Sequence, residues 1–347
     1  MYIKRILLAI ALIGLIIFGY FAYYVYSVMF VPNTAFKGDS EYIYINSGSN
    51  YQAVRQDLML LLEDIETFDA LAKRKKYTTN IKSGKFVIRK GMTNNDIINS
   101  IRSNNVPVKV SFNNQNSLEF LAGRISKQIE ADSLSLIKAF RDVDFYDENG
   151  FSKATALGMY LPNSYELFWN TPAEGFRNRM LKEYNRFWNE ARKVKAKTLN
   201  MSSNEVMALA SIVYEESKQK SEQPIIAGVY INRLKNKWTL DADPTLKFAA
   251  YQLPKYKNTI IRRVLNLHKE IDSPYNTYKY QGLPPGLIAM PDISAIDAVL
   301  NYQKHNYFFF AANAEKPGFH KFARTISQHN QNARDYHRYL NRQGVKK

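Results

Sequence analysis

Two adjacent carboxylates close the segment MSSNEVMALASIVYEES, and helical geometry gives them different surroundings. Ser202 followed by Glu205 has the spacing of a capping box, so a helix is predicted to begin there. At about 100° per residue, one face of this helix is apolar and carries Val206, Leu209, Ile212 and Val213. Glu216 falls close to that face and Glu215 far from it. We therefore expect Glu215 to point to water and Glu216 to border the apolar side.

The expected position of Glu216 suits general acid catalysis. Burial against apolar surface raises the pKa of a carboxyl group, because desolvation disfavours the charged form. A carboxyl group that keeps its proton near neutral pH can protonate a leaving group. The alternative is a structural glutamate at a helix end, paired with a Lys or Arg, and this segment by itself favours that alternative.

Turn-rich segments with polar and aromatic side chains follow this helix, namely LDADPT (240–245), SPYNTY (273–278) and GFHKFARTISQHN (318–330). Such loops around a helical scaffold are typical of a cleft. Tyr275 and Tyr278 have rings that can stack on sugars. Asp243 and Asn276 can bond hydroxyl groups. Packed aromatic residues and turn formers explain each of these positions equally well.

The composition excludes several kinds of chemistry. The 347 residues include no cysteine, which excludes disulfides, thiol nucleophiles and thiolate metal sites. His320 and His329 are candidate polar site residues, but as a metal pair they lack an evident third ligand. We therefore predict no metal and no other cofactor. The net charge of +17 indicates a polyanionic partner such as nucleic acid, anionic lipid or an anionic extracellular polymer.

The N-terminal segment narrows the choice of partner. Residues 6–31 carry no charge and are long enough to cross a bilayer, which takes about 20 apolar residues. A cleaved signal peptide has a shorter apolar region of about 7–15 residues, so this segment is predicted to be an uncleaved anchor. Lys4 and Arg5 favour a cytoplasmic tail at residues 1–5, with the rest of the chain outside the membrane. An exported domain meets no genome, so nucleic acid is not a predicted partner.

The exported part alternates short strands and helices. EYIYIN (41–46) and KFVIR (85–89) read as strands. A helical stretch with Leu58, Leu61, Leu62 and Ile65 lies between them. Thr93 is a suitable cap for a further helix. These segments predict a small strand–helix–helix–strand–helix unit, followed by a larger, mostly helical part with short strands. The predicted fold class is α+β.

Several of these segments together resemble the endolytic murein transglycosylases, also called the YceG-like family. The motifs of the C-terminal half are ALASIVYEES, VYINRL, LDADPT, SPYNTYKYQGLPPG, AIDAVLN and GFHKF…HN, in the family's order and spacing. GKFVIRKGMTNNDIINSI (84–101) is similar to the family's LysM-like subdomain, and GMYLPNSYELF (158–168) also matches. The resemblance implies a LysM-like subdomain at 38–106 and a catalytic domain at 107–347.

The resemblance also implies an activity and a set of site residues. The family's catalytic glutamate is the second Glu of a segment that usually reads ASIVEKE, and it matches Glu216. Tyr214 and Glu215 replace the family's Glu and Lys, and Asp241 replaces a Gln. The implied reaction is cleavage of the MurNAc–GlcNAc β-1,4 bond within peptidoglycan strands, without water, to give 1,6-anhydroMurNAc ends. The residues assigned to substrate binding are Asp243, Tyr275, Asn276, Tyr278, His320 and Asn330.

The resemblance further implies a location and partners. The protein is expected in the bacterial cytoplasmic (inner) membrane as a single-pass protein with its N-terminus inside. Cell-wall synthases are candidate partners, and cutting nascent strands would limit their length. Two alternatives are a non-catalytic murein-binding scaffold and a hydrolytic glycosidase that pairs Glu216 with Asp243 or Asp241.

Overall fold

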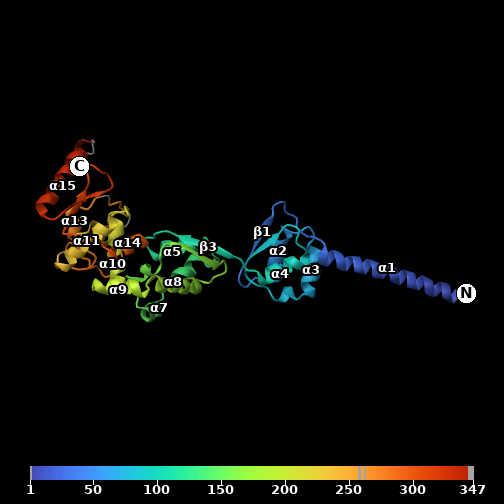
Figure 1. Cartoon of the computed structure of the whole chain (residues 1–347). Coiled ribbons are helices and arrows are strands. Elements are labelled where there is room, and N and C mark those ends of the chain that lie inside the picture. Colours follow the sequence, from blue (N-terminus) through green and yellow to red (C-terminus); the bar gives the residue numbers. More distant parts are fainter. Residues whose placement is uncertain (1, 257–258, 262, 343–347) are drawn as a thin grey trace. The chain divides into compact units, whose positions relative to one another are not determined.

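The computed structural model describes residues 2–342 except 257, 258 and 262. In these residues the chain is rich in helix and contains three two-stranded sheets, in agreement with the predicted α+β class. Contacts divide it into two compact units (Figure 1). The first unit covers the chain up to Val110 together with the segments Lys127–Ala131 and Tyr165–Pro172. The second unit contains Ser111–Ser126, Asp132–Ser164 and the chain from Ala173 onward.

Helix α1 (Tyr2–Phe30) is the N-terminal apolar helix that the sequence predicts. In the described part of the chain it is the one helix long and apolar enough to cross a membrane, with a mean hydropathy of 2.5. Its side chains are almost all exposed, which is consistent with a helix that meets lipid. The last turn differs, because Val28 is buried in the core of the first unit.

Two buried asparagines join the end of α1 to the rest of the first unit. The side-chain amide of Asn94 donates to the carbonyl of Val28 at 3.0 Å and to the hydroxyl of Thr67 at 3.2 Å. The amide of Asn33 donates to Oδ1 of Asn94 and to the carbonyl of Asp64, both at 2.7 Å. Buried polar groups are costly when unpaired, so this network fixes where α1 ends and the unit begins.

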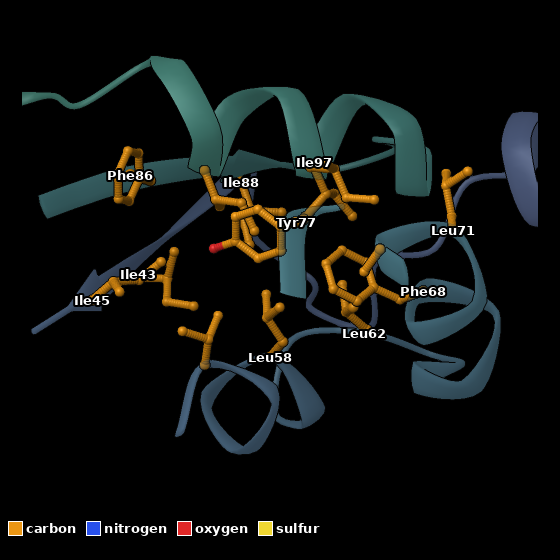
Figure 2. Close-up of a cluster of buried hydrophobic side chains, with 14 of the residues drawn as sticks. Ile43, Ile45, Leu58, Leu62, Phe68, Leu71, Tyr77, Phe86, Ile88 and Ile97 are labelled. Carbon is orange, nitrogen blue, oxygen red and sulfur yellow. The ribbon is translucent and has the colours of Figure 1, made fainter. Parts of the chain in front are cut away.

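The first unit has the predicted order of elements: β1 (Ser40–Ile45), α2 (Tyr51–Met59), α3 (Ile65–Arg74), β2 (Gly84–Arg89) and α4 (Asn94–Ser103). Strands β1 and β2 pair antiparallel, with Ile43 opposite Phe86. Figure 2 shows apolar side chains of both strands and of the helices pointing toward one another. As predicted, Thr93 caps α4, and it forms a capping box with Asp96.

One prediction for this unit is wrong. The stretch from Leu58 to Ile65 is not a continuous helix, because α2 ends at Met59 and α3 begins at Ile65. The carboxylate of Asp64 accepts hydrogen bonds from the backbone N–H groups of Glu66 and Thr67 and so starts a new helix. Of the leucines between the two helices, Leu61 and Leu62 still face the core, whereas Leu60 is exposed.

The remaining elements follow α4 along the chain. Strands β3 (Pro107–Phe112) and β4 (Asn163–Phe168) pair with each other. The helices from α5 to α9 are α5 (Leu118–Ile125), α6 (Ser133–Phe140), α7 (Val143–Asn149), α8 (Ala173–Phe187) and α9 (Glu190–Thr198). The following helices are α10 (Ser203–Glu216), α11 (Gln223–Lys235), α12 (Asp243–Tyr251), α13 (Asn266–Lys269), α14 (Ile293–Leu300) and α15 (Ile326–Arg342).

Helix α10 is the centre of the second unit. It packs against α11, α12 and α14, and its residues from Val206 to Val213 are all buried. Ser202 and Glu205 form the predicted capping box at its start. A helix surrounded in this way has little freedom to rotate or shift, so its last residues are held in fixed positions.

A short hairpin lies against α15. Strands β5 (Phe309–Ala312) and β6 (His320–Ala323) pair antiparallel, with Phe310 opposite Phe322. Helix α15 packs on both strands. Strand β5 covers most of the aromatic run YFFFAA at 307–312. It carries aromatic rings toward α11, where Phe310 meets Tyr230 edge to face at 5.9 Å between ring centroids.

Candidate active site

Glu216 is the last residue of α10, and Ser217 leaves the helix in an extended conformation. Glu215 is exposed and forms a 2.8 Å ion pair with Lys218, so it points to solvent as predicted. Glu216 is only partly exposed. In the described part of the chain its carboxylate has no ion pair with a Lys or Arg; instead, Oε1 accepts a 2.7 Å hydrogen bond from the hydroxyl of Tyr230.

Tyr230 lies on α11 and is almost completely buried. Burial and the neighbouring carboxylate of Glu216 raise the pKa of this phenol well above its ordinary value. Tyr230 therefore stays protonated and acts as a fixed hydrogen-bond donor to Glu216. The contact joins α10 to α11 at the carboxyl group itself.

The pKa of Glu216 is raised to about 7. Desolvation by the surrounding protein is the largest cause, and the negative charge of Asp243 raises the pKa further. The hydrogen bond from Tyr230 and the charge of Lys247 act in the opposite direction, because they stabilise the ionised form. Glu216 thus exchanges its proton near neutral pH, as a residue that serves first as an acid and then as a base requires.

Glu216 opens into a cavity of about 390 Å³, a size within the usual range for small-ligand sites. The cavity is lined by Glu216, Tyr230, Arg233, Leu240, Asp241, Asp243, Lys269, Tyr278, Phe309, Phe310, Ile326 and His329. These residues come from α10, α11, α12, α13, β5, α15 and the intervening loops. Acidic, basic and aromatic side chains therefore line the same small cavity.

Asp243 and Tyr278 are paired on the cavity wall. The hydroxyl of Tyr278 donates to Oδ1 of Asp243 at 2.6 Å, although the two residues are far apart in sequence. The pKa of Tyr278 is raised by burial and by this hydrogen bond, so the phenol remains a donor. A carboxylate can accept several hydrogen bonds, so Asp243 can bind a ligand hydroxyl in addition to Tyr278.

Arg233 holds the loop between α11 and α12, which forms part of the cavity wall. Its guanidinium is largely buried, pairs with Asp241 at 2.9 Å and donates to the carbonyls of Leu240 and Phe308. Asp241 has a positive φ of 49°, which is unusual for a residue with a side chain. Asp241 therefore serves as the counter-ion of Arg233.

Four of the residues assigned to substrate binding do not line this cavity. Tyr275 packs on Phe248, with 4.6 Å between ring centroids. Asn276 is fully buried, and its amide donates to the backbone carbonyls of Lys269 and Ile271. His320 faces Glu222, and Asn330 is exposed on α15. His329, one residue earlier, does line the cavity and packs on Phe309.

The sequence reasoning missed Tyr230, Arg233 and Phe310. Tyr230 and Arg233 belong to VYINRL, which reads from the sequence as part of an apolar stripe. A tyrosine and an arginine three residues apart lie on one side of a helix, and polar groups within such a stripe were the available signal. No local pattern reveals that α11 meets the end of α10.

Comparison with known proteins gives matches over most of the chain. The YceG-like family model matches residues 43–335. The chain is 29% identical to the endolytic murein transglycosylase of Bacillus subtilis (strain 168), over 85% of this chain and 84% of that protein. It is 24% identical to the endolytic murein transglycosylase of Streptococcus pneumoniae (strain D39), over 92% of this chain but only 62% of the relative's length.

A solved structure supports the fold. The crystal structure of a putative YceG-like protein from Listeria monocytogenes superposes with a TM-score of 0.56, covering 84% of this chain and 98% of that one at 24% identity. The family model covers most of the chain, from the first strand to the last helix. The protein is therefore a member of the YceG-like family.

Proposed function

We propose that this protein is a membrane-anchored endolytic lytic transglycosylase that cleaves the MurNAc–GlcNAc β-1,4 bond within peptidoglycan strands. The observation that carries the proposal is the carboxyl of Glu216, whose pKa is about 7 and which faces a cavity with Tyr230 behind it. The names of the relatives from Bacillus subtilis and Streptococcus pneumoniae support the same reaction class.

The proposed reaction needs one carboxyl group. Glu216 donates its proton to the glycosidic oxygen, and the bond from C1 of MurNAc to that oxygen breaks. The Glu216 carboxylate then accepts the proton of the C6 hydroxyl of the same MurNAc, and O6 bonds to C1 to close the 1,6-anhydro ring. The proton returns to Glu216 and no water is consumed. Ordinary glycosidases need a second carboxylate because they use water or a covalent intermediate.

The surrounding residues fit this sequence of steps. Tyr230 donates to the carboxylate that forms after the first proton transfer, so it stabilises the intermediate charge state. Asp243, held by Tyr278, can accept a sugar hydroxyl or offset positive charge at C1. We assign Asp243 and Tyr278 to substrate contact, and we do not extend that role to Tyr275, Asn276 and the other residues outside the cavity.

An exposed aromatic surface borders the cavity. Trp238 is 45% exposed and packs against Phe308 and Phe309, with ring centroids 4.9 and 5.9 Å away. Phe309 also lines the cavity with Glu216. A large ring with one free face suits the apolar face of a sugar, so a glycan strand longer than the cavity can continue across Trp238.

We further propose that α1 is a single-pass anchor with Lys4 and Arg5 in the cytoplasm and both units outside it. We also propose that residues 38–106 form a LysM-like subdomain and residues 107–347 the catalytic domain. An enzyme held at the bacterial cytoplasmic membrane acts where new strands emerge. Cell-wall synthases are therefore the proposed partners, and the proposed effect is to limit the length of nascent strands.

One assay distinguishes this function from a hydrolase and a scaffold. Purified murein is digested with the detergent-solubilised full chain, and the products are weighed by mass spectrometry. Anhydro-ended products support the lytic transglycosylase, whereas products with reducing ends, heavier by one water, indicate a hydrolase. A protein that binds murein and releases nothing is a scaffold. The Glu216→Gln variant must lose the activity while it still binds murein; a fully active variant contradicts the assignment.

A further inference from the structure

A second buried glutamate lies close behind the cavity and has no part in the proposed proton transfers. Glu222 precedes α11 and is only 5% exposed. Its two carboxylate oxygens accept hydrogen bonds from two different segments of the chain. Such a group is costly to bury unless its partners are in place, so its contacts indicate what it holds together.

The first segment is the one that directly follows Glu216. The buried hydroxyl of Ser217 lies 3.4 Å from Oε2 of Glu222. The neighbouring Gln223 donates its side-chain amide to the carbonyl of Ser217 at 3.1 Å. The backbone N–H of Ser217 in turn closes α10 by donating to Val213 at 3.1 Å. The end of the helix that carries Glu216 is thus bonded to the start of α11.

The second segment is strand β6. The backbone N–H of His320 donates to Oε1 of Glu222 at 2.8 Å, and its ring Nδ1 lies 3.1 Å from Oε2. The imidazole meets Phe310 edge to face at 5.2 Å, and Phe310 meets Tyr230 at 5.9 Å. Phe310 and Tyr230 both line the cavity. One carboxylate therefore connects the end of α10 to the aromatic wall of the β5–β6 hairpin.

We propose that Glu222 is a positioning residue of the active site, which holds the segment after Glu216 and the β5–β6 hairpin at a fixed separation. His320 serves this link and is not a substrate ligand. The contacts of Glu222 are with Ser217 and His320 and not with Glu216 itself, so we place its effect on the geometry of the site. The inference rests on the proposed function, since it concerns the same carboxyl group.

The main test measures kcat and KM of the detergent-solubilised full chain with purified murein for the wild type, Glu222→Ala and Glu222→Gln. Misplacement of a catalytic group by ~1 Å can cost about a hundredfold in rate, so we expect Glu222→Ala to lower kcat by about 10- to 100-fold. KM and the pH at which activity is lost should stay close to those of the wild type. Glu222→Gln keeps an acceptor for the N–H of His320 and should recover most of kcat.

The matched control is Asp142→Ala. Asp142 forms a 2.6 Å ion pair with the largely buried Arg177 in the same unit, and neither residue contributes to the cavity. This variant should lose comparable thermal stability and keep its kcat below the unfolding temperature. A Glu222→Ala protein with normal kcat, or an equal loss of kcat in Asp142→Ala, overturns the proposal. Should Glu222→Ala not fold, Glu222→Asp replaces it, because its shorter side chain cannot reach both segments.

Hydrogen exchange tests the link through Glu222 independently of enzymatic activity. In Glu222→Ala, residues 217–223 and 309–323 should lose protection together, while α14 keeps the protection of the wild type. A wild type that releases no fragments from murein contradicts the proposed function, and the exchange result then decides the link by itself. Unchanged protection of both segments contradicts the link whatever the activity.

Discussion

The hydroxyl of Tyr230 donates a 2.7 Å hydrogen bond to Oε1 of Glu216. The contact joins two helices, since Glu216 ends α10 and Tyr230 lies within α11. Desolvation raises the pKa of Glu216, whereas this bond lowers it, and the balance is a pKa of about 7. This hydrogen bond therefore holds the carboxyl group in place and lowers the pH at which it loses its proton.

We expect Tyr230→Phe to move the loss of activity to higher pH. Without the donor, the ionised form of Glu216 is less stable and its pKa rises. The carboxylate formed in the first step also loses a stabilising bond, so kcat should fall by about 2- to 10-fold at its optimum. The measurement is kcat on murein as a function of pH. Tyr146→Phe, which removes a hydroxyl that donates to Phe140, is the control and should leave the pH profile unchanged.

We expect activity of the wild type to fall as pH rises through about 7, because Glu216 must be protonated to act as an acid. The Asp243→Asn variant removes a negative charge that raises this pKa, so its activity should be lost at lower pH than in the wild type. Asp272→Asn alters an exposed carboxylate that bonds Tyr280, and it should keep the wild-type profile. A profile that does not move in Asp243→Asn excludes electrostatic coupling between the two carboxyls.

The raised pKa of Glu216 also predicts a cost in stability. The folded-state pKa of about 7 lies above the ordinary value of 4.5, so the folded protein binds the proton more tightly than the unfolded chain. This contribution is complete below about pH 4.5 and is lost as pH rises to about 7. Between pH 4.5 and pH 8, the free energy of unfolding of Glu216→Gln should therefore rise by about 1–3 kcal/mol relative to that of the wild type. Urea unfolding at the two pH values measures this, and an equal difference at both would contradict it.

We expect Asn94→Ala to weaken the connection between α1 and the rest of the first unit. The substitution leaves the buried carbonyl of Val28 and the amide of Asn33 without one of their partners, at a cost of about 2 kcal/mol in unfolding free energy. Limited proteolysis of the solubilised full chain should then cut faster at residues 31–35. Asn99→Ala, at an exposed position on the same helix, is the control and should change neither quantity. Equal cleavage rates in the two variants would show that the asparagine pair does not fix the helix.

We expect Trp238→Ala to raise KM for long glycan strands by about 3- to 10-fold with kcat unchanged. Loss of the ring removes a contact that is the same in the ground and transition states, which affects binding alone. Short fragments that fill only the cavity should bind as in the wild type. Trp238→Phe keeps a flat ring, so its KM for long strands should lie between those of the wild type and Trp238→Ala. A fall in kcat without a change in KM would mean that Trp238 supports the cavity wall instead.

The sequence alone determined the features that depend on local periodicity and composition. The capping box follows from the spacing of Ser202 and Glu205. A rotation of about 100° per residue gives α10 its apolar face and places Glu215 and Glu216 in different surroundings. The apolar helix α1 follows from a run of uncharged residues, and the order of strands and helices in the first unit follows from alternation and turn residues.

The tertiary structure decided which residues meet Glu216. Tyr230 reaches Glu216 only because α11 packs against the end of α10, and Phe310 reaches Tyr230 only because β5 pairs with β6. His320 has the residue type of a site ligand but bonds to Glu222. Spacing along the chain fixes the faces of single elements, whereas contacts between elements depend on side-chain packing across the whole core, which no local pattern contains.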